Sequence, residues 1–493
     1  MDGCLSTDDV VAVATGSDVA LAAAALERVD QNRRAFVRLI ETGRPIYGVT
    51  TGHGALVLSE VPRELQRQSQ TNLLRSHAAG TGEELPDVVV RAALCVRLNG
   101  LLRGHSGIRP LVLRLLADFL NAGLIPCVPR TGSLGASGDL APSAHAFLPL
   151  IGEGTVRAAD GRRLNGMEAL GELGAKPLEL EAKEALALIN GTHFMGGIGA
   201  LLVVRMRRLL DVADLVAAAT IEALHGALAP FDPRVHRLRG IDGQQESAET
   251  IAAALRGSEY ARGDEVLQDA YSLRCAAQVH GAAREAFTFF AHLVGAEVNA
   301  VTDNPLVFED EVISAGNFHG QALAVAFDTL RLALADLGSV AERRTFRLLS
   351  PSLNGSLPAF LSPSPGPANG YMIVQYVSAA LLSELRALAH PVSIDNVPTS
   401  DNQEDHVSMG MTGALLALQA VERVEHIVAG ELLCACQAID CRPDPPAPAV
   451  AGVHALVRER VPALEEDRPP ADDLAALLPL VRGEELARLA RER

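Results

Sequence analysis

The chain has 493 residues, of which 48% are hydrophobic but only 4% are aromatic, and it contains no tryptophan. A core built mainly from Ala, Leu and Val favours closely packed helices over a large β-sandwich, and with 21% charged residues the chain is not disordered. Its 43 Lys and Arg against 60 Asp and Glu give a net charge of −17, which argues against nucleic acid or an anionic membrane as a partner, since both require a basic surface.

The N-terminus, Met1 to Cys4, has neither a basic segment nor an apolar run, so we expect no secretory signal peptide. The chain carries an odd and scattered set of seven cysteines: Cys4, Cys95, Cys127, Cys275, Cys434, Cys436 and Cys441. Such a set in a chain without a leader indicates reduced thiols and a cytoplasmic location. Cys434 and Cys436 lack the two-residue gap usual in zinc sites, and no second pair accompanies them, so we expect no metal there.

The first 190 residues, taken as an N-terminal region, alternate helical stretches with turns rich in glycine and threonine. The turns lie at 47–54, 80–82, 131–138 and 152–154. The most unusual sequence among them is the run GSLGASGDLAP at 132–142, which is the strongest candidate for chemistry.

Three ordinary interpretations of this run were compared. A phosphate-binding loop would need Gly-Lys-Ser/Thr and a preceding strand, whereas Pro126 and Pro129 stand just upstream. A nucleophile elbow would need glycine where Asp139 stands. A plain turn capped by Asp139 is acceptable when the segment is considered alone.

A backbone cyclisation is the alternative that the small residues of this turn permit. If the nitrogen of Gly138 attacks the carbonyl carbon of Ala136, a five-membered ring closes, and Ser137 can then lose water to leave an exocyclic methylidene. A Cβ on residue 138 would obstruct the bend and crowd the attacking nitrogen, so glycine is required there. The product is an electrophile, which no ordinary side chain supplies.

Helical periodicity is strongest between residues 191 and 440, which we predict to be a central bundle of long helices. Apolar residues recur at three- and four-residue steps over 202–216 and 418–432, with charged residues between them, and a third such run covers 321–343. These segments are interpreted as scaffold rather than as site.

The last region, 441–493, is predicted to hold a connector and C-terminal helices. Its proline-rich run at 442–451 is expected to be extended. An amphipathic helical segment follows at 471–493, and we expect it to be interrupted at Pro479.

The motif Ala136-Ser137-Gly138 closely resembles the prosthetic-group motif of the aromatic amino acid ammonia-lyases and aminomutases, which form 4-methylidene-imidazol-5-one (MIO). Further segments resemble motifs of this family and fall in its order: 47–54 (YGVTTGHG), 188–192 (LINGT), 268–275 (QDAYSLRC), 302–305 (TDNP), 316–319 (GNFH) and 403–409 (QEDHVSM). Together they span residues 47 to 409, so the chain is identified as a member of this family. The resemblance implies a mainly α fold, in which a smaller N-terminal region carries the tyrosine and MIO loops and a long helical bundle follows.

The resemblance also implies the chemistry. Ammonia elimination from an α-amino acid must overcome a poor leaving group and a weakly acidic β-proton; the MIO electrophile answers the first and a positioned base the second. Tyr47 is implied to be that base. A free phenol has a pKa near ~10, so its neighbours must favour the phenolate for it to act near neutrality.

The remaining site residues are assigned by the same resemblance. Arg274 is implied to clamp the substrate carboxylate, because a guanidinium binds a carboxylate through two parallel bonds. Asn190 and Tyr271 would hydrogen-bond the prosthetic group or the leaving amine. Gln268 and Phe318 would line the pocket.

Two positions bear on the substrate. His77 occupies the position that contacts the substrate ring in this family, and a histidine there suits a polar ring. Glu404 lies in a block that resembles the histidine-specific branch. A carboxylate could hold a protonated imidazole, whereas burying it against a phenyl ring would be costly. The pair favours L-histidine as substrate, with trans-urocanate and ammonia as products.

The chain departs from the family pattern at several positions. Thr50 and His53 stand where the tyrosine loop usually has Asn and Phe, and His193 stands where histidine-specific members usually have Gln. Ala270 replaces a usual proline, and 385–386 reads Leu-Arg where Asn-Lys is common. Thr50, His53 and His193 are therefore predicted modifiers of the pocket.

The leading interpretation is a carbon-nitrogen lyase of histidine catabolism. The alternatives are an MIO-dependent 2,3-aminomutase acting on histidine or tyrosine, which would return ammonia to the β-carbon, and a lyase acting on tyrosine. A serine hydrolase using Ser137 would need an elbow that is absent, and a non-catalytic helical scaffold would not require an intact Ala-Ser-Gly.

The resemblance further implies a homotetramer whose active sites combine residues from several subunits. It implies no diffusible cofactor and no metal. The run of Glu404, Asp405 and His406 is predicted not to bind a metal, because alternating residues on a helix do not share a face.

Overall fold

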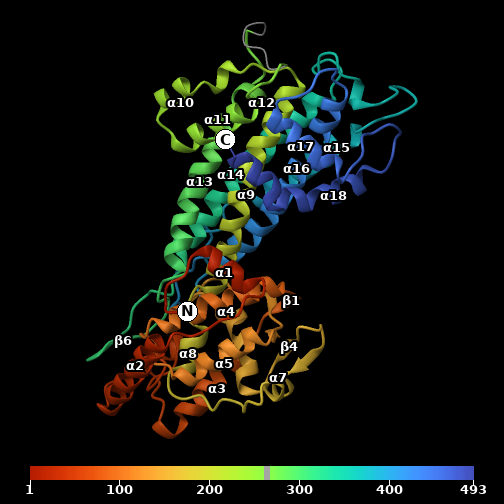
Figure 1. Cartoon of the computed structure of the whole chain (residues 1–493). Helices are drawn as coiled ribbons and strands as arrows, with labels where there is room; N and C mark the ends of the chain where they lie inside the picture. The colour runs from red at the N-terminus through yellow and green to blue at the C-terminus, as the bar shows by residue number, and fades with distance from the viewer. Residues whose placement is uncertain (260–266, 493) are drawn as a thin grey trace. The chain divides into compact units, whose positions relative to one another are not determined.

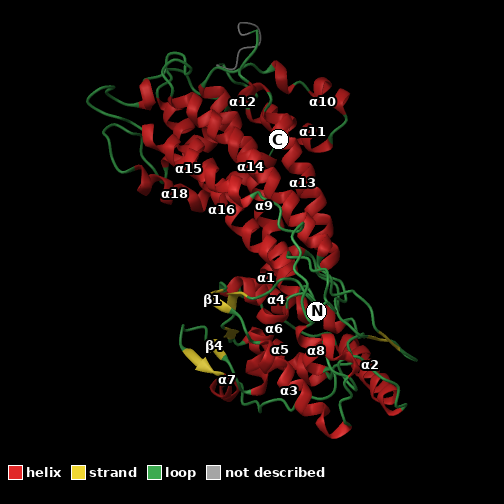
Figure 2. Ribbon diagram, turned by 180° about the vertical axis from the view of Figure 1, so that it is seen from behind, coloured by secondary structure: helices red, strands yellow, loops and turns green. Residues whose placement is uncertain are grey.

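A computed structural model describes residues 1–259 and 267–492. Over these residues the chain is mainly helical, with nineteen α-helices and seven short strands (Figures 1 and 2), as composition and periodicity predict. Two compact units interleave along the chain: the first comprises Met1–Val204, Phe290–Phe327 and Pro391–Leu415, and the second Arg205–Phe289, Asp328–His390 and Leu416–Arg493. The contiguous regions predicted as 1–190, 191–440 and 441–493 stay a prediction.

The first unit holds eight helices of its own, which are α1 (Thr7–Ala14), α2 (Ala23–Glu41), α3 (Gln66–His77), α4 (Asp87–Leu102), α5 (Pro110–Asn121), α6 (Leu140–Phe147), α7 (Gly166–Glu172) and α8 (Glu184–Ile189). A capping box on Ser6 begins α1, and Pro110 supplies the first turn of α5. Almost every residue of α4 is buried, so this helix forms the centre of the unit.

The strands of the first unit are short and antiparallel. β1 (Thr81–Glu84) pairs with β3 (Pro129–Thr131), and a three-stranded sheet has the order β2 (Ile125–Pro126), β4 (Thr155–Arg157), β5 (Arg163–Asn165). β6 (Leu306–Val307) and β7 (Val312–Ile313) form a separate hairpin. Such short strands connect helices and do not form a core of their own.

Four long helices contribute residues to both units: α9 (His193–Ala223), α13 (Ala276–Glu297), α14 (Gln321–Leu349) and α16 (Gly410–Asp440). The predicted helices at 202–216, 321–343 and 418–432 are confirmed as parts of α9, α14 and α16. The apolar positions that define the first and third of these patterns are buried, apart from the half-buried Leu418, which is why the periodicity predicted them.

The second unit contains the remaining helices: α10 (Pro233–Arg239), α11 (Asp242–Ala254), α12 (Tyr271–Arg274), α15 (Met372–Leu388), α17 (Pro448–Arg458), α18 (Pro470–Arg482) and α19 (Glu484–Arg491). Five 3₁₀ turns complete the described elements: Gly54–Leu58 (η1) and Arg63–Leu65, Leu148–Ile151, Ala229–Phe231 and Ala359–Leu361.

A buried ionic network crosses the second unit. The guanidinium of Arg344 donates to both carboxylate oxygens of Glu431, at 2.6 and 3.0 Å, and to Nε2 of His280 at 3.2 Å. Because Arg344 can only donate, Nδ1 of His280 carries the ring proton and donates it to Asp214 at 2.7 Å. Arg284 also pairs with Asp214, so each buried charge of the network has a partner.

Two expectations about the C-terminal region are wrong. The proline-rich run is extended only to residue 447, because α17 begins at Pro448; a proline at the first helical position gives up no hydrogen bond. Pro479 lies inside α18 and does not interrupt it. The break comes at Gly483, whose extended backbone separates α18 from α19.

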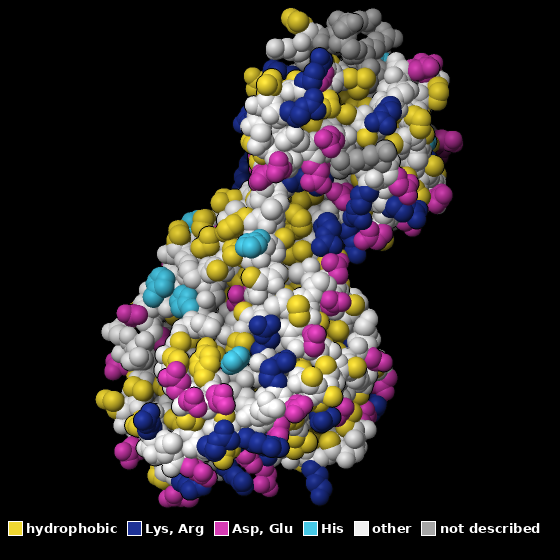
Figure 3. Space-filling view, turned by 60° about the vertical axis from the view of Figure 1, so that its left-hand side comes forward, with side chains coloured by type: hydrophobic (Ala, Val, Ile, Leu, Met, Phe, Trp, Pro, Cys, Tyr) yellow, Lys and Arg dark blue, Asp and Glu magenta, His cyan; other side chains and the backbone are white. Residues whose placement is uncertain are grey.

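No described helix is both long and apolar enough to cross a bilayer. On the face drawn in Figure 3, the described Lys and Arg side chains are interspersed with Asp and Glu and form no continuous basic patch. This distribution agrees with the excess of acidic residues in the chain.

Candidate active site

Tyr47 lies in a turn that follows α2. Thr50 closes this turn: its hydroxyl oxygen accepts from the backbone N–H of Ile46 at 2.7 Å, and its own N–H donates to the Ile46 carbonyl at 3.0 Å. The phenolic oxygen of Tyr47 accepts from the backbone N–H of Gly54 at 2.9 Å. Gly54 begins η1 with a φ of 55°, a conformation that suits glycine.

The surroundings of Tyr47 have opposing effects on its acidity. Burial raises the pKa of Tyr47 above its usual value, the Gly54 N–H lowers it, and the charge of Glu404 raises it further. Within one chain, the first and third effects dominate, so the phenol is protonated at neutral pH. For Tyr47 to act as a base, its phenolate must therefore be populated by a higher pH or by a cation from outside the chain.

Glu404 is positioned by a left-handed turn at 399–404. Ser400, Asp401 and Asn402 all have positive φ, and the backbones of Thr399 and Glu404 bond each other at 3.0 and 3.3 Å. The Thr399 hydroxyl donates to Oε2 of Glu404 at 2.8 Å. This turn is tied to the tyrosine loop, because the N–H of residue 55 donates to Oγ of Ser400 at 2.9 Å.

The tripeptide Ala136–Gly138 folds back on itself. Ser137 and Gly138 both have positive φ, 51° and 83°, and the Gly138 N–H donates to the Gly135 carbonyl at 3.2 Å. Gly191 brackets the turn: its N–H donates to the Ser137 carbonyl at 3.1 Å, and its carbonyl accepts from the N–H of Asp139 at 2.8 Å. A Cβ on Gly138 would lie 2.2 Å from that carbonyl oxygen. Such a tight turn, closed to a larger residue, fits the cyclised group.

The carboxylate of Asp139 caps a helix, but not the one that follows it. Asp139 stands at the N-cap of α6, but its side chain makes no capping bond to that helix; its Oδ2 accepts from the N–H groups of Phe194 and Met195, both at 3.0 Å, at the start of α9. Burial raises the pKa of Asp139 to about 7, although these two N–H groups lower it. The Asp139 carboxylate therefore joins the turn at 132–138 to the start of α9.

A cavity of about 470 Å³ in the first unit brings several predicted residues together. Of the predicted residues, Tyr47, His53, His77, Ser137, Asn190 and Glu404 line it. The other lining residues are Gly54, Leu56, Ser69, Asn72, Leu73, Ser76, Leu140, Leu186, Ile189 and Ser400. A neighbouring cavity of about 270 Å³ shares four of these residues and adds Ala136 and Gly138. The candidate base, the tripeptide and the candidate specificity residues therefore face common space.

Both histidines of the cavity are neutral near pH 7. His77, the last residue of α3, has a pKa lowered by burial, an effect that Glu404 partly offsets. Burial lowers the pKa of His53 to about 4; its ring lies edge-on to Tyr47, with ring centres 6.0 Å apart, and its Nε2 is buried without a partner. Glu404 is the only carboxylate among the described residues that line the cavity.

Thr50, His193 and Phe318 are not among the lining residues. The Thr50 hydroxyl accepts from the Ile46 N–H and so stabilises the turn that carries Tyr47. His193 is buried at the start of α9, where its Nε2 lies 2.8 Å from Oγ of Ser143. Phe318 is half-buried in the segment before α14. The predicted roles of these three residues stay predictions.

Gln268, Tyr271 and Arg274 belong to the second unit. The Arg274 guanidinium stacks over the Tyr271 ring, 4.7 Å from its centre, and donates to the carbonyl of Asp269 at 2.9 Å and to Oε1 of Gln268 at 3.2 Å. Yet 72% of Tyr271 is exposed. These residues contact one another and are accessible to solvent.

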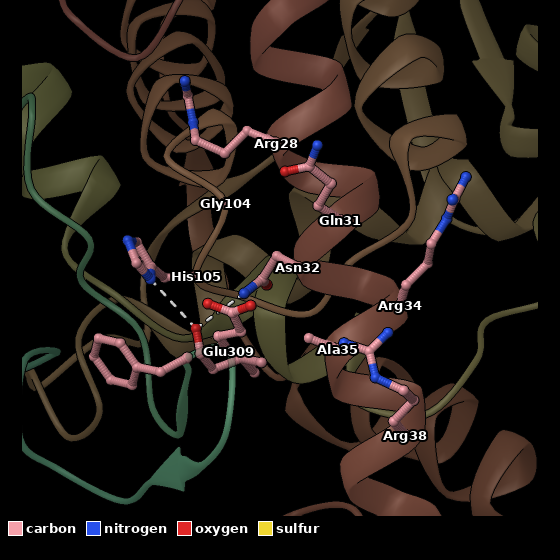
Figure 4. Close-up of a pocket in the computed structure, with 11 residues that line it drawn as sticks. Arg28, Gln31, Asn32, Arg34, Ala35, Arg38, Gly104, His105 and Glu309 are labelled. Atoms are coloured by element: carbon pink, nitrogen blue, oxygen red, sulfur yellow. Dashed lines mark hydrogen bonds between the residues drawn. The ribbon is translucent and has the colours of Figure 1, made fainter.

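Another cleft of the first unit, about 450 Å³, contains no predicted site residue (Figure 4). Its α2 wall carries Arg28 and Arg34, which are engaged with the Leu102 carbonyl and with Asp30 respectively. Asn32 and His105 converge on one backbone oxygen of the facing segment, as the dashed lines in Figure 4 show. These side chains make structural contacts, and none of the residues that line the cleft is a predicted catalytic or binding residue.

The run of Glu404, Asp405 and His406 is not helical, contrary to the prediction, because the 399–404 turn continues directly into extended chain. Over residues 1–259 and 267–492 there is no group of three or more His, Cys, Asp or Glu side chains arranged to hold a metal ion.

Several residues that build the site were not predicted. Ser400 joins two loops through a contact 345 residues apart in sequence, for which no local signal exists. Ser69 and Asn72 line the cavity from α3 and look like ordinary surface positions of a helix. Lys183 and Asp303 lie beneath Asn190. Of these two, only Asp303 belongs to a motif noted in the sequence, the one at 302–305.

Comparisons with known proteins agree with this geometry. The sequence profile described as aromatic amino acid lyase matches residues 5–459. A histidine ammonia-lyase of Symbiobacterium thermophilum is 49% identical over 98% of this chain and 96% of its own length. The crystal structure of histidine ammonia-lyase from Trypanosoma cruzi is similar over 100% of this chain and 94% of that chain, with a TM-score of 0.92 and 38% identity. That of a tyrosine aminomutase from Streptomyces globisporus covers 100% and 98%, with a TM-score of 0.95 and 39% identity.

Proposed function

The chain belongs to the aromatic amino acid lyase family, and from this premise we propose that it eliminates ammonia from L-histidine to give trans-urocanate. The observation that carries the choice of substrate is Glu404, the one carboxylate among the described residues of a cavity that also holds Tyr47 and Ser137. A half-buried carboxylate such as that of Glu404 pairs with a protonated imidazole, whereas a phenyl or phenol ring would leave it uncompensated. The similarity to proteins named histidine ammonia-lyase supports the same reaction.

Ala136, Ser137 and Gly138 would form the MIO group without a diffusible cofactor. Closing the ring joins the Gly138 nitrogen to the Ala136 carbonyl carbon, and the ring closure and the dehydration of Ser137 together release two waters. The consecutive left-handed residues and the bracketing contacts of Gly191 support this assignment. When present, the group supplies the electrophile that makes the amino group a better leaving group.

Tyr47 is proposed to remove the β-proton of the substrate. Its phenolic oxygen is held by the Gly54 N–H, a contact that stabilises the phenolate. Burial and the charge of Glu404 oppose that form, so a cation from another copy of the chain would help to generate it. Arg274 is the candidate, since this half-buried residue stacks on the exposed Tyr271 and its guanidinium also suits the substrate carboxylate.

A homotetramer with shared sites is proposed for the assembled protein. Large apolar side chains are exposed on the long helices and near them: Phe289, Val325, Leu332, Phe346, Ile373, Tyr376 and Val377. Exposed apolar surface of this kind marks association, and the solvent-facing Tyr271 needs a partner surface to act on a substrate. A cytoplasmic location is proposed from the free cysteines.

The test is a turnover assay with L-histidine, L-tyrosine and L-phenylalanine, which scores ammonia, the ultraviolet absorption of the acrylate and the position of nitrogen in the product. L-Histidine is expected to give urocanate and equimolar ammonia. A β-amino acid without net ammonia would show an aminomutase instead. Intact mass should be two waters below the sequence mass, and Ser137→Ala should restore the unmodified mass and abolish turnover.

A further inference from the structure

Beneath Asn190 lies a fully buried ion pair. Nζ of Lys183 donates to Oδ2 of Asp303 at 2.7 Å, and neither side chain is accessible to solvent. Nδ2 of Asn190 donates to the other carboxylate oxygen at 3.3 Å and to the Asn304 carbonyl at 2.9 Å. Asp303 therefore receives donors from Lys183 and Asn190 at once.

Both donors belong to one short helix. Lys183 is the N-cap of α8 and Asn190 is its C-cap, so a single carboxylate holds the helix at both ends. Lys183 has a φ of 74°, in the left-handed region, which costs a non-glycine residue conformational energy. Burial lowers the pKa of Lys183, and the charge of Asp303 opposes that effect. Helix ends do not require such an arrangement, because polar side chains or water cap them at lower cost.

The ion pair determines which way the Asn190 amide points. A carboxylate paired with an ammonium offers only acceptors, and so does the Asn304 carbonyl. The end of the amide that faces them must be the NH₂ group, because a flipped amide would place its oxygen against two acceptors. Oδ1 is thereby turned the opposite way, where it is buried and has no partner within the chain.

Asn190 is among the residues that line the cavity with Tyr47 and Ser137. A buried carbonyl oxygen without a partner calls for a donor. The α-ammonium of the substrate and the departing ammonia are donors, whereas the carboxylate of the substrate is not.

We propose that the Lys183–Asp303 pair is a positioning device, which fixes the Asn190 amide so that its oxygen accepts a hydrogen bond from the amino group of the substrate; this role rests on the proposed ammonia-lyase reaction. Asn190 touches the reacting group, while Lys183 and Asp303 act through it. The motif at 302–305 and the strained backbone of residue 183 thereby acquire a function in the reaction.

A double-mutant cycle tests the device. Asp303→Asn keeps the shape of the side chain but can present a donor to Asn190, so the amide is no longer forced into one orientation. In the wild-type background it is expected to lower kcat by roughly tenfold, the size of one lost hydrogen bond with a charged group, with kcat expressed per mole of dehydrated tripeptide from intact mass. In an Asn190→Ala background the same change should lower kcat by less than about twofold. An equal loss in both backgrounds would overturn the positioning role.

A control and a second variant separate positioning from folding. Asp473→Asn removes a buried carboxylate that pairs with Arg468 and Tyr371 in the second unit, and should leave kcat per dehydrated tripeptide unchanged. If Asp303→Asn is insoluble, Lys183→Gln takes its place. This variant removes the charge but keeps a donor, and it should also lower kcat. A drop in melting temperature or in dehydrated fraction alone, with kcat per group unchanged, would show a purely structural pair.

A binding measurement keeps the inference distinct from the proposed function. In a Ser137→Ala background, which removes turnover, L-histidine should bind more tightly than its analogue without the amino group, 3-(imidazol-4-yl)propionate. Asp303→Asn should reduce that difference by about tenfold. Failure of wild-type protein to release urocanate would contradict the proposed function only. An unchanged affinity difference would contradict the positioning role only.

Discussion

Two tyrosines were assigned to one reaction, and the structure gives them opposite environments. Tyr47 is half-buried, its phenolic oxygen is held by the Gly54 N–H, and its loop is tied to the 399–404 turn through Ser400. Tyr271 is largely exposed, and the contacts of its turn are mainly with residues within six positions, such as Arg274 and Asp269. The first tyrosine is held by tertiary contacts, the second mainly by local ones.

The difference indicates how the site is divided. The first unit brings the candidate base, the serine of the tripeptide and the candidate specificity residues to one cavity. The turn of Tyr271 and Arg274 is preformed yet presented to solvent, as expected for residues that serve another copy of the chain. Substitutions in each unit test this division.

The largest effect is expected at Tyr47. Tyr47→Phe removes the proton acceptor and keeps the ring, so kcat should fall by about a thousandfold, within the usual range for a general base. Urocanate absorbance measures the loss, and intact mass checks that the tripeptide is still dehydrated. A loss below about tenfold would mean that another group takes the β-proton.

Arg274→Lys should have the next largest effect. A lysine cannot make two parallel bonds to a carboxylate, so KM for L-histidine is expected to rise roughly tenfold to a hundredfold with the fold unchanged. Co-expression with Tyr47→Phe chains offers a sharper readout. At L-histidine concentrations below the raised KM, mixed assemblies should be more active than either variant alone, because some sites then combine an intact Tyr47 with an intact Arg274. No recovery would place both residues in a site made by one chain.

Glu404→Gln tests the substrate rather than the chemistry. Without the carboxylate, kcat/KM for L-histidine should fall by about thirtyfold, the cost of a lost charge-assisted bond, while any residual activity on L-phenylalanine should be little changed. Asp405→Asn is the matched control, since Asp405 is exposed and does not line the cavity. Equal losses for both substrates would remove Glu404 from a specificity role.

The smallest effect expected is a dependence on pH. The pKa of Tyr47 is raised above its usual value, so the reactive phenolate is a minor form near neutrality and grows as pH rises. The pKa values of His53 and His77 are lowered, so neither titrates above pH 7. kcat/KM should therefore rise about tenfold between about pH 7 and 8. A flat profile would indicate that another copy of the chain depresses the pKa of Tyr47 in the assembly.

Much of the fold and part of the site could be predicted from the sequence. The stripes in α9, α14 and α16 predicted long helices, because burial of one helix face leaves a regular apolar period. The motifs around Tyr47, Ser137, Asn190 and Glu404 named residues that the structure brings to one cavity. By contrast, α17 and the break at Gly483 were missed, because the many prolines there suggested extended chain and a kink.

Contacts between distant segments could not be predicted in this way. The Ser400 bond to the tyrosine loop and the Lys183–Asp303 pair join residues 345 and 120 positions apart. The Asp139 carboxylate caps α9, accepting from a backbone N–H 55 positions along the chain. Such pairings depend on how helices pack, which local residue patterns do not encode.

The amino-acid sequence by itself determined the helical class and the small residues that permit cyclisation at Ala136–Gly138, because helix periodicity and adjacent backbone atoms are local properties. Only the tertiary structure decided that His53 and His77 are neutral, that the Tyr47 phenol is made less acidic, and that the Asn190 oxygen is left without a partner. Protonation and amide orientation follow from burial and from the nearest charges and hydrogen-bonding groups, and folding alone places these around a side chain.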